Sequence, residues 1–360
     1  MSDALIKKFM ASAFRQEPDP TSFLSDMFMT TERDIFEGEV VEIDSVRGNE
    51  EYAVDVTPYS SGRGNQVTLF TRKEYTPPAY DELTYLTVKE LGKVQPGKTE
   101  YQLTSDFANL VVDRQIPLRN KILRGREMLC RDALFLGKIT LINGDVIDFK
   151  QKASHQYVVP LAWTNSTANP LNDFSIVGDR VRKNGKKTIA DAVFGRQSIQ
   201  DFLNNDIVKA QADLKQIERF AMTSPLAEQD GSKYHGTFSA DDYKINVWTY
   251  PQFVTVPTGF SLPNEGTDVP YIPTDKIVVL ADAPDFRLFY AANPVLVPAS
   301  PQLAEFTGLS RMPAMARGKM RPYFYLDEEE CSLKIGVKSR QLPVPVGIDQ
   351  FAIMTTTPAP

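Results

Sequence analysis

The sequence predicts an α+β protein with two intertwined domains, and three patterns support this fold class. Period-two alternation of apolar and polar residues between 39 and 80 indicates a long β-ribbon. A stripe of apolar residues at helical spacing between 117 and 137 indicates one long helix. Two short apolar runs on either side of Asn143-Gly144 then indicate a β-hairpin.

Composition limits the function before any motif is considered. The 360 residues carry 40 Lys+Arg against 46 Asp+Glu, a formal charge of −6. This acidic balance argues against a histone-like or repressor-like protein, whose affinity comes from neutralising phosphates. Two cysteines and two histidines exclude a disulfide framework, a cysteine-based zinc site and a multi-histidine metal centre. We therefore expect no metal, no cofactor and no catalytic residues.

The first 38 residues are predicted to form an N-terminal arm. Apolar residues between 6 and 14 have helical spacing but form no long apolar region of a signal peptide. A second apolar cluster follows at Phe23, Leu24, Met27 and Phe28. Two alternatives stay open, an arm that packs on something other than its own core and a helix docked on its own domain. No membrane span is expected, because the long uncharged stretches are polar or interrupted by prolines.

The ribbon between 39 and 80 has a polar, glycine-containing tip. On one strand Tyr52, Val54 and Val56 alternate with Ala53, Asp55 and Thr57, and on the other Val67 and Leu69 alternate with Gln66, Thr68 and Phe70. The tip consists of Ser60, Ser61, Gly62, Arg63, Gly64 and Asn65. An isolated two-stranded ribbon is marginally stable in water, so we expect it to lean on a neighbouring subunit, with Arg63 reaching a carboxylate there.

The long helix has one apolar stripe and one charged face. The stripe consists of Leu118, Ile122, Gly125, Leu129, Ala133 and Leu136, and the opposite face of Arg119, Arg124, Glu127 and Arg131. Pro117 suits either the first turn or a kink after an extension over 105–116 with Ser105 as its cap. Gly137 suits the position after the last turn, and a hairpin over 136–149 follows.

A second domain is predicted beyond about residue 152, where Asn, Pro and Thr become more frequent. Helices are expected over 171–182, 191–204 and 207–222, and strands over 245–250, 276–281, 333–337 and 351–354. Residues 251–273 are expected to form a proline-punctuated loop.

No catalytic motif is found in the sequence. The phosphate-binding loop GxxxxGK[ST], the nucleophile motif GxSxG and the zinc motif HExxH are all absent. His155 has no obvious triad partner, and Cys130 lies in the predicted long helix, where a structural thiol is expected. The acidic run Asp327–Glu330 is read as a solvated surface rather than a cation site. A chain of this length without catalytic residues is better explained as a structural protein.

One basic cluster is present, at Arg182, Lys183, Lys186 and Lys187, between two predicted helices. It is compatible with a solvated loop, with contact to nucleic-acid phosphates, or with an acidic surface of a partner. No aromatic residues interleave with the basic ones, so a stacking platform for single strands is not supported.

A series of short motifs follows in a fixed order between about residues 30 and 355. Val56-Thr57-Pro58 leads to the glycine loop and then to Pro77-Pro78, and the long helix runs into Gly137-Lys138 and the hairpin ending Ile147-Asp148-Phe149. Trp163, NPLNDFSIVGDRV, AVFGRQSIQDFLNND and RQLPVPVGIDQFAIM follow. This order resembles the lambda-like (E-type) major capsid proteins of tailed bacteriophages.

The resemblance implies the Hong Kong 97 (Johnson) capsid fold. The implied divisions are an N-terminal arm (1–38), an extended loop (39–90), a peripheral domain with a spine helix (91–154), an axial domain (155–322) and a C-terminal return to the peripheral domain (323–360).

The implied function is a structural major capsid protein of the virion. Copies are expected to assemble in the host cytoplasm, as hexamers and pentamers, into an icosahedral head shell. The shell would enclose double-stranded DNA without sequence-specific binding, with scaffolding, portal and possible decoration proteins as partners and no membrane. The ribbon tip and the basic cluster would then be subunit-interface residues. The alternatives are an encapsulin-like compartment and a carboxylate-based hydrolase using residues such as Asp145 and Asp148.

Overall fold

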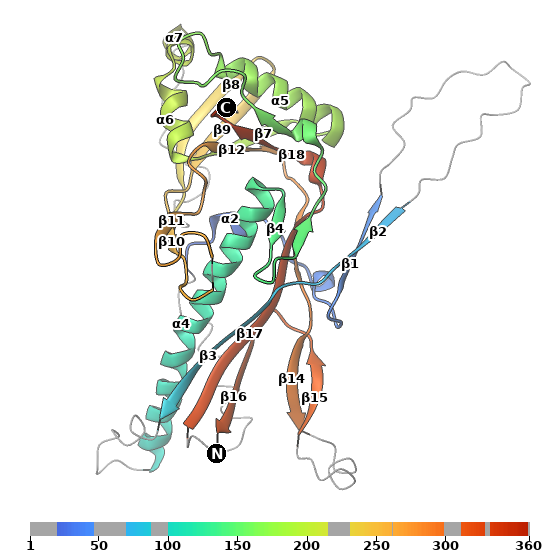
Figure 1. Cartoon of the computed structure of the whole chain (residues 1–360), viewed down its shortest axis with the longest axis vertical. Coiled ribbons are helices and arrows are strands. Elements are labelled where there is room, and N and C mark those ends of the chain that lie inside the picture. The colour runs from blue at the N-terminus through green and yellow to red at the C-terminus, as the bar shows by residue number, and fades with distance from the viewer. Residues whose placement is uncertain are drawn as a thin grey trace, which may run out of the picture.

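The computed structural model of the chain describes residues 20–46, 70–87, 100–214, 231–260, 262–298, 311–327 and 332–358. Figure 1 shows an elongated molecule, with a sheet and short helices at one end and a long helix beside a narrow sheet running to the other. A two-stranded ribbon leaves the side of the molecule (Figure 1). The mixture of helices and sheets confirms the α+β prediction.

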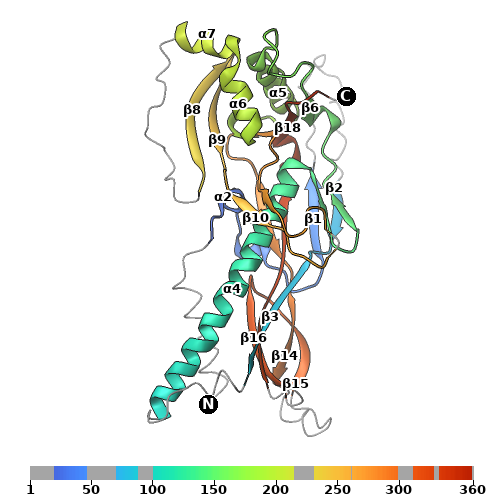
Figure 2. The ribbon, with the colours of Figure 1, turned by 60° about the vertical axis from the view of Figure 1, so that its left-hand side comes forward.

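A six-stranded sheet lies at the end of the molecule with the short helices. Its strands are β6 (Gln156–Val158), β18 (Phe351–Thr355), β12 (Lys276–Ala281), β7 (Ile189–Phe194), β9 (Tyr243–Thr249) and β8 (Lys233–Ala240), in that order. Helices α5 (Pro170–Gly185), α6 (Arg196–Asn204) and α7 (Asp206–Leu214) lie beside it (Figure 2). Phe174 of α5 and Phe202 of α6 both pack on Phe238 of β8, with ring centroids 5.0 and 4.9 Å away. Burial of this apolar surface holds the helices on the sheet.

The long helix α4 (Glu100–Phe135) runs along the other half of the molecule. It passes through Pro117 without a break, so the prediction of a start at Ser105 or Pro117 is wrong. Pro117 and Asp113 are both exposed, so water can bond the Asp113 carbonyl that Pro117 leaves without its helical donor. Leu129 and Ala133 are buried, as the apolar stripe predicts.

A four-stranded sheet lies beside α4 and is organised around one long strand. β17 (Ser332–Pro345) pairs with β13 (Phe286–Tyr290) near one end, and with β16 (Arg321–Asp327) and β3 (Ala79–Thr87) near the other. β3 falls inside the predicted extended loop (39–90), yet it belongs to this sheet. β13 comes from the predicted axial segment and pairs with β17, so the boundary expected at 322 cuts through a sheet.

Four two-stranded hairpins or ribbons complete the described structure. They are β1 (Val41–Val46) with β2 (Phe70–Tyr75), β4 (Lys138–Thr140) with β5 (Val146–Asp148), β10 (Phe253–Thr255) with β11 (Asp268–Pro270), and β14 (Asn293–Pro298) with β15 (Arg311–Ala316). The β4–β5 pair confirms the predicted hairpin, with Gly144 at a φ of 87° in its turn. The β10–β11 pair lies within the segment that was expected to be a loop.

One other helix prediction is wrong, and a second is tested only in part. Residues 191–204 were expected to be one helix, but β7 occupies 189–194 and α6 starts after Gly195. The apolar run Ala192–Phe194 suits either structure, and pairing with β12 and β9 selects the strand. The helix expected over 207–222 is α7 up to Leu214, and residues 215–222 lie outside the described structure.

The six-stranded sheet is a wall shared by two hydrophobic cores. In β12, Val278 and Leu280 face the core that contains α4, whereas Ile277 and Val279 face the core under α5 and α6. β18 alternates likewise, with Phe351 on one side and Met354 on the other. The last two strands of the chain therefore lie in different sheets: β17 belongs to the narrow, four-stranded sheet and β18 to the six-stranded sheet.

Candidate assembly interface

The chain between residues 20 and 38 crosses the molecule as a strap, and its first half packs on the chain's own core. Helix α2 (Phe23–Asp26) buries Leu24, and Phe28 stacks on Phe286 of β13 with ring centroids 5.3 Å apart. Of the two alternatives for this cluster, docking on its own domain is therefore correct. The predicted helix over residues 1–16 lies outside the described residues.

The Glu127 side chain of α4 holds the first half of the strap by hydrogen bonds. Its carboxylate accepts hydrogen bonds from the backbone N–H groups of Leu24 at 2.7 Å and Ser25 at 2.9 Å. The residue is 1% exposed, and burial raises its pKa to about 7, although the two backbone donors favour the charged form. The apolar stripe placed Glu127 on the exposed face of the helix, which is wrong.

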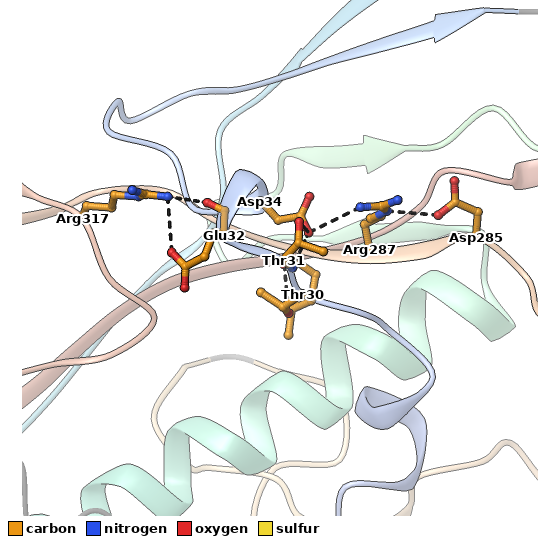
Figure 3. Close-up of polar contacts among 8 residues, drawn as sticks. Thr30, Thr31, Glu32, Asp34, Asp285, Arg287 and Arg317 are labelled. Atoms are coloured by element: carbon orange, nitrogen blue, oxygen red, sulfur yellow. Dashed lines mark hydrogen bonds and ion pairs between the residues drawn. The ribbon is translucent and has the colours of Figure 1, made fainter.

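The second half of the strap is held by a polar network on β13 (Figure 3). In helix η1 (Glu32–Asp34), the Asp34 carboxylate accepts from the Thr31 backbone N–H at 2.6 Å and from the Thr31 hydroxyl at 2.7 Å. Arg287 lies 3.7 Å from the same carboxylate and 3.0 Å from Asp285. The pattern Thr31-x-x-Asp34 is a capping-box signal, so sequence inspection could have found it.

Arg317, between β15 and β16, binds the strap from the other side (Figure 3). Its guanidinium donates to the backbone carbonyls of Glu32 and, at 2.9 Å, of Ile35. Isolated β-bridges also join Met29 to Arg287 and Ile35 to Tyr290. No local sequence pattern marks Arg287 or Arg317 as partners of residues about 250 to 285 positions away. These contacts fix the strap on the body of the molecule, so the chain enters the ribbon from a fixed position.

The ribbon begins a few residues after the strap. β1 and β2 pair antiparallel from Val41↔Tyr75 to Val46↔Phe70, which confirms the paired base of the predicted ribbon. The two strands point away from the body of the molecule in Figure 1. The tip residues Ser60, Ser61, Gly62, Arg63, Gly64 and Asn65 lie outside the described residues, so their contacts stay a prediction.

The basic cluster was predicted to be a loop between two helices, and this is wrong: it lies between helix α5 and strand β7. Arg182 and Lys183 lie in the last turn of α5, where positive charge is favoured by the helix dipole. Lys186 ends the helix at a φ of 55°, and the Lys187 ammonium donates to the Ala283 carbonyl. A Cβ on Gly185 would lie 2.3 Å from the Asp349 carbonyl oxygen, so the backbone at Gly185 packs closely on the short helix η4 (Ile348–Gln350). The segment Arg182–Lys187 is thus a fixed helix end.

The other residues considered for chemistry are Cys130, His155 and Asp148, and their contacts are those of structural residues. Cys130 is fully buried, and burial raises the pKa of its thiol. His155 bonds the Phe351 carbonyl through Nδ1 and Asn184 through Nε2, and burial lowers its pKa. Asp148 receives a bond from the Lys150 backbone N–H, which lowers its pKa and makes it a poor general acid.

The described residues contain neither a candidate metal site nor a helix suited to span a membrane. No group of three or more His, Cys, Asp or Glu side chains within them is placed to hold a metal ion. None of the helices in these ranges has both the length and the apolar character needed to cross a bilayer.

Solved structures of other proteins align with nearly the whole of this chain. The putative capsid protein of a prophage from E. coli CFT073 aligns with a TM-score of 0.61 at 13% identity, over 97% of this chain and 98% of that chain. A phage-related protein from Bordetella bronchiseptica RB50 gives 0.49 at 10%, over 99% and 98%. The holo-SrpI encapsulin complex from Synechococcus elongatus PCC 7942 gives 0.43 at 11%, over 97% and 95%. The first of these likenesses shows that the two chains share a fold, in agreement with the Hong Kong 97 capsid fold that the sequence predicts.

The sequence itself specifies the family. Residues 8–355 match the family described as phage major capsid protein E, so the chain belongs to that family. No protein with a curated description matches it. Family membership makes the chain a structural protein of the virion capsid, whose copies assemble with one another.

Proposed function

We propose that copies of this capsid protein join through the ribbon, whose tip lies on an adjacent subunit in hexamers and pentamers. The observation that supports this most directly is the position of the ribbon base. The strap fixes the chain up to Ile35 by hydrogen bonds and ion pairs, and β1–β2 then points away from the body (Figure 1). A ribbon this thin has little of its own chain to pack on, and a neighbouring copy supplies that surface.

The wider assembly is part of the same proposal. The head shell is icosahedral and encloses double-stranded DNA without sequence-specific contacts, in keeping with a chain whose formal charge is −6. Scaffolding, portal and possible decoration proteins are its partners, and assembly takes place in the host cytoplasm. The role is purely structural. The arm, extended-loop, peripheral, axial and C-terminal divisions describe its domains, with β13 and β18 exchanged between the two main parts.

Deletion of Gly62–Asn65 tests the ribbon contact. The shortened chain should fold, because the strap and β1–β2 remain, but it should fail to form closed shells in size-exclusion chromatography and negative-stain microscopy. Arg63→Gln is the matched variant, since it keeps the ribbon length and removes only the charge that is expected to meet a carboxylate. Normal shells from the deletion variant would refute the proposal.

The encapsulin-like alternative is separated by the contents of native particles. Nucleic acid inside nuclease-treated particles supports a genome container, whereas protein cargo without nucleic acid supports a compartment.

A further inference from the structure

Four segments of the chain meet at one buried histidine. His155 ends helix η2 (Ala153–His155), and its ring is hydrogen-bonded to the last turn of α5 and to the first residue of β18. Helix η4, just before β18, adds Asp349, which lies 3.2 Å from Lys152 at the start of η2. His155 is 0% exposed, so its ring nitrogens depend on protein partners.

A chain of three hydrogen bonds runs through the His155 ring. Lys152 Nζ donates to Asn184 Oδ1 at 3.1 Å, and Asn184 Nδ2 lies 3.0 Å from His155 Nε2. On the other side of the ring, His155 Nδ1 lies 2.9 Å from the Phe351 carbonyl oxygen. An ammonium can only donate and a carbonyl can only accept, so the two ends fix the direction of every bond between them. Nδ1 therefore carries the proton, and Nε2 accepts from the Asn184 amide.

This chain of bonds cannot take a second proton on the ring. A proton on Nε2 would point at the NH₂ group of Asn184, which is itself a donor. Turning the amide round would give Nε2–H an acceptor, but it would place the NH₂ group against the Lys152 ammonium. Protonation of His155 therefore breaks one of the bonds, whichever way the Asn184 amide is turned.

The charges around the ring oppose protonation as well. Two cations face it, Lys152 beside η2 and Arg180 on α5, and one carboxylate, Asp349 on η4. That carboxylate is already paired with Lys152. Burial, with a smaller effect of the two cations, lowers the pKa of His155, although the Phe351 carbonyl and Asp349 act in the opposite direction. The folded chain thus favours the neutral ring that the hydrogen bonds require.

The bonds hold the end of α5 against β18. Asn184 lies in the last turn of α5, within the basic segment Arg182–Lys187. Lys187 has a separate hold, because its ammonium donates to the Ala283 carbonyl. Loss of the Asn184 bonds would therefore loosen the last turn of the helix while the residue that follows it stays anchored.

We propose that Lys152, Asn184 and His155 form an acid-sensitive latch, which holds the end of α5 at neutral pH and releases it when the His155 ring becomes charged. Because the folded state favours the neutral ring, the latch is fully stabilising above about pH 6.5, the ordinary histidine value. Its contribution is lost as the pH falls below that value. The latch lies within one chain, so it is independent of the ribbon and of any contact between copies.

Hydrogen exchange of the full-length chain from about pH 7.5 to 5 tests the latch, after correction for the pH dependence of chemical exchange. In wild type, the protection of residues 182–186 should fall by up to about tenfold per pH unit below 6.5, the slope that one bound proton gives. Helix α6 takes no part in these bonds and should show no such loss. His155→Gln removes the titration and should abolish the pH dependence. His235→Gln removes the other histidine of the chain and is the matched control, which should behave as wild type.

Asn184→Asp is a second variant of nearly unchanged size. Its carboxylate accepts from Lys152 and from a protonated ring alike, so acidification should no longer lower the protection of residues 182–186. This result decides the question even if His155→Gln fails to fold. The same acid dependence in His155→Gln as in wild type would overturn the proposal, as would an Asn184→Asp chain that still loses protection in acid. A parallel loss of protection in α6 would also overturn it, in favour of general acid unfolding.

Discussion

Glu127 links two segments about a hundred residues apart through a single carboxylate. Its two carboxylate oxygens accept the hydrogen bonds from Leu24 and Ser25 of the strap. The same carboxylate lies near Tyr250 and Tyr271 in the core. Burial opposes its charge, and the backbone donors of Leu24 and Ser25 support it. The balance leaves a titration near neutral pH inside a structural protein.

The pH dependence of stability follows from this titration. With a folded pKa of about 7 and an unfolded pKa near the ordinary glutamate value, the native state binds a proton that the unfolded chain has released. The contribution of Glu127 to the free energy of unfolding should therefore fall by about 3 kcal/mol as the pH rises from 4.5 to 7, and stay level above that. Chemical denaturation of wild type and Glu127→Gln across this range measures the difference, because glutamine removes the titration.

The control for this prediction lies on the same helix. Asp113→Asn changes an exposed acid of α4 and should leave the pH profile of wild type unchanged. If wild type and Glu127→Gln lose stability in parallel between pH 4.5 and 7, the buried carboxylate is not the cause.

Leu129 and Ala133 test the apolar stripe of α4. They are 7% and 0% exposed and belong to the core beside β13 and β17. Leu129→Ala should lower the free energy of unfolding by roughly 2–5 kcal/mol, through lost transfer energy and a residual cavity. Ala133→Lys should lower it further because it buries an unpaired ammonium. Urea titration measures both, and exposed Arg124→Ala on the same helix should change little. Wild-type stability in both core variants would mean that the helix presents another face.

At the scale of elements, the strap is stabilised by residues of unequal weight. Asp34 is 4% exposed and accepts two bonds from Thr31, whereas the side chain of Glu32 is 88% exposed in its contact with Arg317. Loss of a buried acceptor leaves donors without partners, while an exposed ion pair contributes little. The order of the strap therefore depends on Asp34 more than on Glu32.

Hydrogen exchange of the strap measures this inequality. Asp34→Ala should cost about 1–3 kcal/mol locally and speed exchange over residues 30–36, with α4 unaffected. Glu32→Ala, in the same short helix, should leave exchange nearly unchanged. Equal acceleration in the two variants would assign the order of the strap to its backbone bridges with β13 instead.

Elements with a strong local pattern were predictable from the sequence. The ribbon base, the hairpin at Asn143-Gly144 and the stripe of α4 depend on alternation, turn chemistry and spacing within a short window. The strand at 189–194 was not predictable, because only pairing with β12 and β9 separates it from a helix. Glu127, Arg287 and Arg317 were missed for the same reason, since their partners lie far away in the sequence.

At the scale of the whole molecule, the shared sheet makes the two halves one mechanical unit. Strands β7, β12 and β18 each place residues in both cores. Because close-packed interiors transmit strain, a displacement of the end with the short helices should also shift the packing around α4. The basic segment Arg182–Lys187 lies at that end, and Gly185 packs on the turn that leads into β18. A contact between copies at this segment would therefore act on a rigid body.

The last prediction is that the basic segment makes a contact between copies in a ring and does not face the genome. Arg182 and Lys183 are exposed and would repel their counterparts on nearby subunits unless carboxylates intervene. A chain with a formal charge of −6 also has little general affinity for DNA. Replacing Lys183, Lys186 and Lys187 by Gln should weaken assembly of empty particles, and raised salt should do the same by screening exposed charges over about 8–10 Å.

The bond from Lys187 to the Ala283 carbonyl calls for a second variant in this experiment. Lys183→Gln alone, at an exposed position, keeps that bond, so weakened assembly here is caused by lost charge and not by a loosened segment. Light scattering of empty particles and packaging of DNA are measured side by side. If empty shells of both variants form normally and only packaging fails, the segment faces the genome. If neither measurement changes, the segment is a solvated helix end whose charges serve the α5 dipole alone.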